Sequence, residues 1–192
     1  MHPIAISPAH AYTDPDGAAY DSVTSFLARG GFVDDEWFTP ESRLRGQYVH
    51  RAIDLDLQHD LVEPADDDPI RGYVLAARKF LAEAQTMTVF SELQLADPTL
   101  RIAGTLDWIG QVNGTATIVD WKSGQPQPAH RLQLAAYEYL AFCNELGARF
   151  ARATVYLRPD GTYKMVSHTD RHDWQIAQAA LTLARWRSIH GC

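Results

Sequence analysis

The sequence has little lysine and little cysteine, and it has no long apolar run. Only three of its 17 basic residues are lysines, Lys79, Lys122 and Lys164, so each lysine is a candidate for a chemical role that arginine does not fill. Cys143 and Cys192 form no closely spaced pair, which argues against a disulfide framework or an iron–sulfur cluster. No segment approaches the roughly 20 apolar residues of a membrane span, and no signal peptide is visible. These absences predict a cytoplasmic protein.

The length and composition suit one globular domain. The chain has 192 residues, of which 46% are hydrophobic and 21% are charged, which is ordinary for a packed core with a solvated surface. Prolines and a glycine interrupt the polar residues 1–20, so we expect an extended or partly ordered N-terminal arm there. Residues 21–192 show no shift in composition, and we expect them to form a single domain.

Hydrophobic periodicity predicts helices and strands in separate groups. Capping and stop signals favour a short helix first, then two longer helices, three strands, a helix, two strands and a final helix. The helices are expected at residues 22–29, 41–59, 70–85, 129–146 and 171–189. The strands are expected at residues 88–95, 101–111, 115–122, 150–158 and 163–168. This order predicts an α/β fold with a central mixed sheet flanked by helices.

Residues 104–122 predict a β-hairpin that brings two carboxylates and a lysine together. Successive side chains of a strand point to opposite faces, so Asp120 and Lys122 share a face and Trp121 points away. If Asp107 on the neighbouring strand faces the same way, two oxygen ligands lie beside an ammonium. That set suits Mg²⁺ or Mn²⁺ together with a phosphate. The ordinary alternative, two solvated aspartates and an edge lysine, is left open by the hairpin alone.

Several residues outside the hairpin bear on the same site. Gln133 and Tyr137 are four apart on a predicted helix and share a face. Gly104 weakens its strand, which suggests a bulge or the close approach of another group. Glu92 is expected to share a strand face with Phe90 and Gln94. His50 lies beside the apolar stripe of residues 44, 49, 53 and 57, where a histidine is more often packed or exposed than a ligand.

Together these residues resemble the PD-(D/E)XK nuclease superfamily, and most closely its RecB-like exonuclease branch, which has phage-borne and CRISPR-associated members. The likeness runs from about Ser22 to Tyr139, and the segment Arg45–His50 looks like the Gly-x-x-x-His segment of that branch. The cysteines that hold an iron–sulfur cluster in some relatives are missing. The motifs are His50, Glu92, Gly104-x-x-Asp107, Asp120-x-Lys122 and Gln133-x-x-x-Tyr137.

The resemblance implies a role for each motif residue. Glu92 would touch a metal through water or brace the site, and Lys122 would be the catalytic lysine. Gln133 and Tyr137 would contact DNA or steady the active site. The implied metal ligands are His50, Asp107, Asp120 and the backbone carbonyl of Trp121.

The implied activity is hydrolysis of DNA by a Mg²⁺- or Mn²⁺-dependent exonuclease that serves recombination, repair or phage genome processing. Three alternatives stay open: a structure-specific or nicking endonuclease of the same fold, a catalytically silent nucleic-acid-binding module, and an enzyme acting on small phosphates. The net charge of −7 is unfavourable for binding DNA, because affinity comes largely from lysine and arginine at phosphates. A local basic groove, the metal ions, a recombination or replication partner, or a homo-oligomer would offset it.

Overall fold

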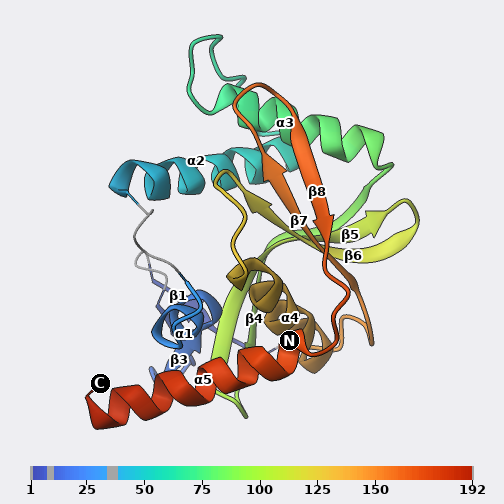
Figure 1. Ribbon diagram of the computed structural model, residues 1–192. Coiled ribbons are helices and arrows are strands. Elements are labelled where there is room, and N and C mark those ends of the chain that lie inside the picture. The colour runs from blue at the N-terminus through green and yellow to red at the C-terminus, as the bar shows by residue number, and fades with distance from the viewer. Residues whose placement is uncertain (1, 8–10, 34–38, 192) are drawn as a thin grey trace.

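A mixed sheet with helices packed on both faces forms the core of the protein (Figure 1). The structure, a computed structural model, describes residues 2–7, 11–33 and 39–191. The helices are α1 (Val23–Arg29), α2 (Pro40–Leu57), α3 (Arg71–Glu83), α4 (Ala129–Cys143) and α5 (Asp173–His190). The strands are β1 (Ala5–Ile6), β2 (Tyr12–Thr13), β3 (Ala19–Ser22), β4 (Met87–Asp97), β5 (Ile102–Val112), β6 (Thr115–Lys122), β7 (Ala151–Leu157) and β8 (Tyr163–Ser167).

The predicted α/β class and the order of the ten predicted elements are confirmed. Most boundaries differ from the predicted ones by one to three residues, because helix and strand ends depend on capping and pairing partners that periodicity does not show. Within the described part of the chain, no helix has both the length and the apolar character needed to cross a bilayer. Cys143 is a free thiol, whereas Cys192 lies outside the described residues.

Strand β5 has an edge that is shared by two different strands. The sheet order is β1-β2-β3-β5-β6-β7-β8, and β4 pairs with β5 along its other edge. On the shared edge, β3 pairs in parallel with Ile102 and Ala103, and β6 pairs antiparallel from Trp108 to Val112. Residues 104–107 lie between these two pairings and have no strand partner on that edge among the described strands. We call this gap, residues 104–107, the fork of β5.

The N-terminal segment is more ordered than its sequence suggests. Where we expected an extended or partly ordered arm, the described residues contain three short strands, and the last of them joins β5. Tyr12 and Tyr20 are buried against Ala96 and Ala103. Strands of two residues are too short to show an alternating pattern, so the sequence could not reveal them. The division of the chain into an arm and a domain stays a prediction.

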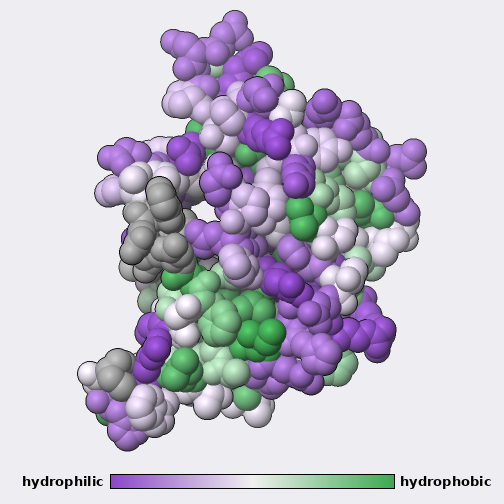
Figure 2. Space-filling view, viewed as in Figure 1, coloured by the Kyte–Doolittle hydropathy of each residue, from purple (hydrophilic) through white to green (hydrophobic). Residues whose placement is uncertain are grey.

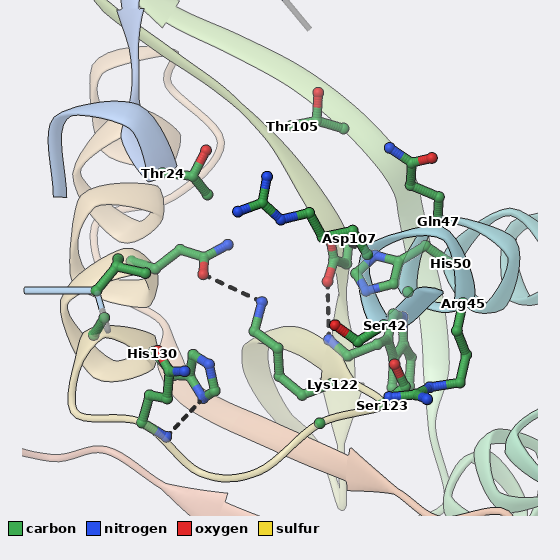
Figure 3. A pocket seen from close by; sticks show the side chains of 18 of the residues that line it. Thr24, Ser42, Arg45, Gln47, His50, Thr105, Asp107, Lys122, Ser123 and His130 are labelled. Atoms are coloured by element: carbon green, nitrogen blue, oxygen red, sulfur yellow. Dashed lines mark hydrogen bonds and ion pairs between the residues drawn. The ribbon is translucent and has the colours of Figure 1, made fainter. Parts of the chain in front are cut away.

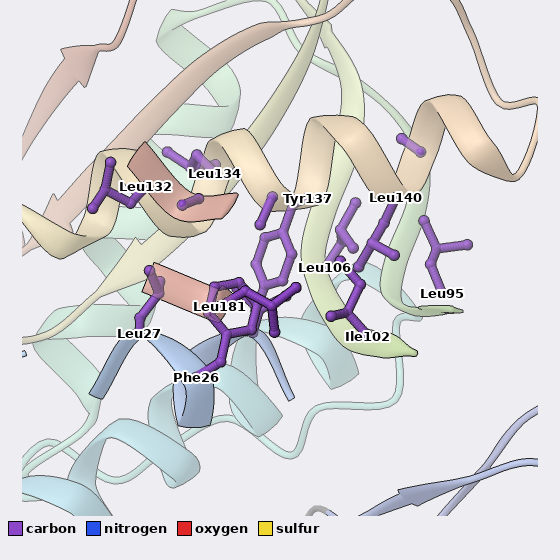
Figure 4. Packing of buried hydrophobic residues seen from close by; sticks show 14 of the residues in the cluster. Phe26, Leu27, Leu95, Ile102, Leu106, Leu132, Leu134, Tyr137, Leu140 and Leu181 are labelled. Carbon is purple, nitrogen blue, oxygen red and sulfur yellow. The ribbon is translucent and has the colours of Figure 1, made fainter. Parts of the chain in front are cut away.

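Two hydrophobic cores lie on the two faces of the sheet. Helices α1, α4 and α5 cover one face and bury residues such as Phe26, Leu134 and Leu181 (Figure 4). Helices α2 and α3 cover the other face, where Phe80 packs edge-on against Trp121 at a ring distance of 5.6 Å. The first turns of α2 extend beyond the sheet (Figure 1), so Leu44, expected on the apolar stripe, is exposed.

Candidate active site

Glycine at the fork allows α4 to approach the sheet. A Cβ atom at Gly104 would lie 2.7 Å from Cε1 of Tyr137 and 3.3 Å from Cγ2 of Val23, so a larger residue would push the tyrosine ring away. The predicted close approach is therefore confirmed. The buried hydroxyl of Tyr137 accepts a hydrogen bond of 3.0 Å from Nε2 of Gln133. The tyrosine thus packs behind the fork and supports a glutamine that faces the groove.

Asp107 occupies the end of the fork and divides its two oxygen atoms between two partners. Oδ2 accepts a 2.8 Å hydrogen bond from the backbone N–H of Trp121 on β6. Oδ1 lies 3.3 Å from Nδ1 of His50 on α2, and Figure 3 shows the two side chains facing each other. Partial burial lowers the pKa of His50, but the Asp107 carboxylate outweighs this and raises the pKa to about 9. The protonated, positively charged form of His50 is therefore favoured beside the Asp107 carboxylate.

Glu92 completes a group of three potential metal ligands. One ligand atom each from His50, Glu92 and Asp107 lies within 4.8 Å of the other two. Burial, followed by the nearby Asp107, raises the pKa of Glu92 to about 7. Two carboxylates and an imidazole at this spacing suit a divalent cation, whose charge would relieve the repulsion between the carboxylates.

The backbone at Glu92 departs from the expected strand. Its φ is +49°, in the left-handed region, which costs a residue with a side chain about 1–3 kcal/mol. Phe90 and Leu93 are three apart, yet both pack on the same core. The expected sharing of one face by Phe90, Glu92 and Gln94 is therefore wrong. Strain of this kind is concentrated at functional sites, and here it accompanies the placing of Glu92 beside Asp107.

A second group of side chains surrounds Asp120, whose side chain is 0% exposed. Its Oδ1 accepts hydrogen bonds from Lys122 Nζ at 2.9 Å and from Gln133 Nε2 at 3.0 Å. Gln133 Oε1 in turn accepts one from Lys122 at 3.2 Å. Burial raises the pKa of Asp120 to about 6, although Lys122 opposes the shift. Burial lowers the pKa of Lys122, but Asp120 outweighs this and raises it, so the lysine stays charged.

One atom of this second group is left without a hydrogen bond. Asp120 Oδ2 is buried and lies 2.8 Å from Lys122 Nζ, but it accepts no hydrogen bond from the described residues. The Lys122 ammonium therefore offsets part of the cost of burying this oxygen, which keeps lone pairs for a further cation. The donor set of the two groups therefore fits a divalent metal ion. In this structure Asp120 is nevertheless outside the group of three ligands.

His50, Glu92 and Asp107 of the first group and Lys122 and Gln133 of the second line one groove of about 1770 Å³, and Asp120 is buried behind them. Figure 2 shows the surface opening beneath α2. The structure thus brings His50, Glu92 and Asp107 together, and Figure 3 shows Lys122 across from His50 and Asp107. Trp121 points into the core beneath α2 and α3, as expected from strand alternation. A role for its backbone carbonyl as a ligand stays a prediction.

The sequence argument missed two groove residues, His130 and Tyr156. Their side chains meet at 3.0 Å between His130 Nδ1 and the Tyr156 hydroxyl. His130 precedes Gln133 by three residues on α4, so a shared helix face was a readable signal. Tyr156 gave no local signal, because its position depends on the pairing of β7 with β6.

Comparison with models of known protein families assigns the chain to a superfamily. The family model of the PD-(D/E)XK nuclease superfamily matches residues 26–190. The chain therefore belongs to the PD-(D/E)XK nuclease superfamily, whose members are metal-dependent hydrolases that act on nucleic acids. The superfamily predicted from the motifs is confirmed.

Comparison with solved structures finds similar chains at low sequence identity. A candidate exonuclease from Eubacterium rectale has a TM-score of 0.55 and 11% identity, covering 90% of this chain and 82% of that chain. The alkaline exonuclease LHK-Exo from Laribacter hongkongensis has a TM-score of 0.46 and 14% identity, covering 89% of each chain. Comparison with curated proteins finds no match.

Proposed function

We propose that this protein is a Mg²⁺- or Mn²⁺-dependent deoxyribonuclease that acts as an exonuclease. The observation that supports it most is the ligand group of His50, Glu92 and Asp107, which lines the same groove as Lys122. Asp120, whose buried carboxylate forms an ion pair with Lys122, would join these ligands. The bound cation supplies an acidified water and neutralises charge on the phosphate.

Lys122 has the capacity to bind substrate. Its ammonium has three hydrogen-bond donors, and within the described residues it donates to Asp120 and Gln133. The ammonium also lies 2.8 Å from Asp120 Oδ2, and the Lys122 side chain is 20% exposed, so a phosphate oxygen or the attacking water can approach it from the groove. A charged donor held in a largely water-excluded site stabilises the negative charge that develops in the transition state. Lys122 is therefore the proposed catalytic residue.

Gln133 and Tyr137 act as positioning residues in this proposal. The Gln133 amide accepts from Lys122 through Oε1 and donates to Asp120 and to Tyr137 through Nε2. This pattern fixes the orientation of the amide and holds the ammonium and the carboxylate in a single arrangement. The site is thus preorganised before substrate arrives.

DNA cleavage with divalent metal is the direct test. We expect end-labelled linear DNA to be shortened from its ends in Mn²⁺, no cleavage in EDTA, and no cleavage by Asp120→Ala. Cleavage of covalently closed circular DNA would favour the alternative endonuclease of the same fold. If neither DNA nor RNA is cut in either metal, the protein is instead a binding module. The retention of Asp107, Asp120 and Lys122 argues against that outcome, since binding alone does not require this set.

Replacement of Lys122 separates catalysis from metal binding. We expect Lys122→Ala to lower single-turnover cleavage by at least about 100-fold. Mn²⁺ binding, measured by calorimetry, should be retained, because removal of the ammonium leaves Asp120 with no competing positive charge. Cleavage at the wild-type rate would refute the proposed role of the lysine.

The net charge of −7 remains to be offset when DNA binds. We propose that a recombination or replication protein, or further copies of this chain, helps to hold the DNA. Size-exclusion chromatography with light scattering, with and without DNA, tests the self-association.

A further inference from the structure

The groove has a half that supplies hydrogen-bond donors and carries no carboxylate. Of its lining residues from Trp121 onward none is acidic, whereas Lys122, His130, Arg158 and Lys164 are basic. All the acidic lining residues come from the earlier part of the chain, where Glu92 and Asp107 lie. The earlier part also supplies Arg43, Arg45 and Arg51, so the later part differs in having basic lining residues with no acidic ones among them.

Within this half, three side chains form a row across the sheet. Lys122 on β6 is in register with Tyr156 on β7, and Tyr156 is in register with Lys164 on β8. Residues in register on adjacent strands present their side chains on the same face, and all three line the groove. The row leads from the reaction centre toward Lys164, which is exposed.

His130 lies beside this row, on the far side of Lys122 from His50 (Figure 3). Its Nδ1 atom accepts a hydrogen bond of 3.4 Å from the backbone N–H of Gln127. Nδ1 also lies 3.0 Å from the Tyr156 hydroxyl, which can donate to it. In the tautomer that accepts both of these hydrogen bonds, the imidazole hydrogen is on Nε2.

The Nε2–H of His130 is a donor that lacks a partner among the described residues, although the residue is only 8% exposed. Burial, with the nearby charge of Lys122, lowers the pKa of His130 to about 3, so the ring is neutral at physiological pH. His130 lines the groove, so a ligand there that accepts hydrogen bonds can pair with this donor.

We propose that His130 and Lys164, on either side of Tyr156, bind the nucleic-acid phosphate next to the scissile one. This proposal rests on the proposed nuclease function and adds the direction in which the substrate backbone leaves the reaction centre. A phosphate suits the subsite because the Nε2–H of His130 and the ammonium of Lys164 donate hydrogen bonds, and phosphate oxygens accept them. In addition, α4 begins at Ala129 without a side-chain cap, so the positive end of its dipole faces this part of the groove.

Matched variants test the two residues separately. His130→Asn keeps an acceptor near the position of Nδ1 and removes the Nε2 donor. His130→Gln has a longer side chain, whose amide N–H can take the position of the Nε2 donor. Lys164→Gln removes one charge in the groove. Lys79→Gln removes the same charge on α3, outside the groove. The readout is the Kd for a fluorescein-labelled DNA oligonucleotide in Ca²⁺, measured by anisotropy over a series of salt concentrations.

We expect His130→Asn and Lys164→Gln to raise the Kd about 10-fold, with partial rescue in His130→Gln and no change in Lys79→Gln. The slope of log Kd against log salt should fall by about 1 for Lys164→Gln and stay unchanged for His130→Asn, since only the lysine is charged. In wild-type protein labelled with ¹⁵N-histidine, the Nε2 resonance of His130 should move when the oligonucleotide is added. This last measurement needs no variant to fold.

The outcomes separate this subsite from the nuclease function. Wild-type affinity in both variants, or a stationary His130 resonance while DNA is bound, overturns the subsite even if the protein cleaves DNA. Weaker binding by both variants supports the subsite even if wild-type protein cleaves nothing. Absence of DNA binding by the wild-type protein overturns both.

Discussion

At the residue scale, Asp107 serves the metal group and the sheet at the same time. Its Oδ2 accepts a hydrogen bond from the backbone N–H of Trp121, and its Oδ1 faces His50. Active-site side chains commonly reduce stability, so that their removal stabilises the protein. Asp107 differs, because one of its oxygens satisfies a buried backbone donor on the neighbouring strand.

Two replacements of Asp107 should therefore differ in stability while sharing a loss of metal binding. Asp107→Asn keeps an acceptor for Trp121, whereas Asp107→Ala leaves that N–H unpaired, which costs about 1–3 kcal/mol. We expect urea unfolding to show the alanine variant less stable than the asparagine variant by this amount. Mn²⁺ binding should be lost in both. Equal stabilities would show that the hydrogen bond to β6 does not hold the sheet.

His130 should couple stability to pH. Its pKa of about 3 in the folded protein lies below the ordinary value of 6.5, so between these values only the unfolded chain binds the proton. Stability is then full above pH 6.5 and falls as the pH drops toward 3. From pH 7 to pH 5 the wild-type protein should lose about 2 kcal/mol more than His130→Gln. Urea unfolding at both pH values measures the difference, and equal losses would contradict a neutral buried ring.

At the scale of elements, the N-terminal strands complete the sheet beside the fork. The Tyr12 hydroxyl is hydrogen-bonded to Oγ1 of Thr105 at 2.9 Å, and Asp21 of β3 pairs with Ile102 of β5. The segment expected as an arm thus forms one wall of the site.

Removal of residues 1–13 should therefore destabilise the protein. The deletion removes β1, β2 and the buried Tyr12, and loss of one large buried side chain costs about 2 kcal/mol. For a chain of this length we expect the Tm to fall by about 4–8 °C. Differential scanning calorimetry measures it, and an unchanged Tm would mean that the segment only rests on the surface.

The sequence predicted the long elements and the motif residues because those signals are local. Asp120 and Lys122 on one strand, or Gln133 and Tyr137 on one helix, follow from the spacing of residues along a single element. The fork and the position of Tyr156 depend on which strands meet, so no single segment contains them. The left-handed backbone of Glu92 was equally hidden, because glutamate gives no sign of a positive φ.

At the scale of the whole molecule, an acidic protein carries a groove with a half that lacks carboxylates. The net charge of −7 describes the surface as a whole, whereas binding depends on local charge. The part of the groove where the phosphate backbone is proposed to bind has basic lining residues and no acidic ones. An overall acidic charge is therefore compatible with nucleic-acid binding.

Metal binding should stabilise the whole fold. A ligand at about 100 times its Kd stabilises the folded state by about 2.7 kcal/mol, so saturating Mn²⁺ should raise the Tm by about 5–10 °C. EDTA should reverse the shift, and Asp107→Asn should abolish it. A wild-type Tm that does not change when Mn²⁺ is added would argue against a metal site within the fold.

Folding must assemble the fork of β5 from distant parts of the chain. The β4–β5–β6 meander forms from neighbouring segments, whereas β3 must reach Ile102 and Ala103 from the N-terminal region in a parallel pairing. Non-local parallel pairings form slowly. The two ligand residues of the meander, Glu92 and Asp107, are therefore expected to be in place before the wall that encloses them.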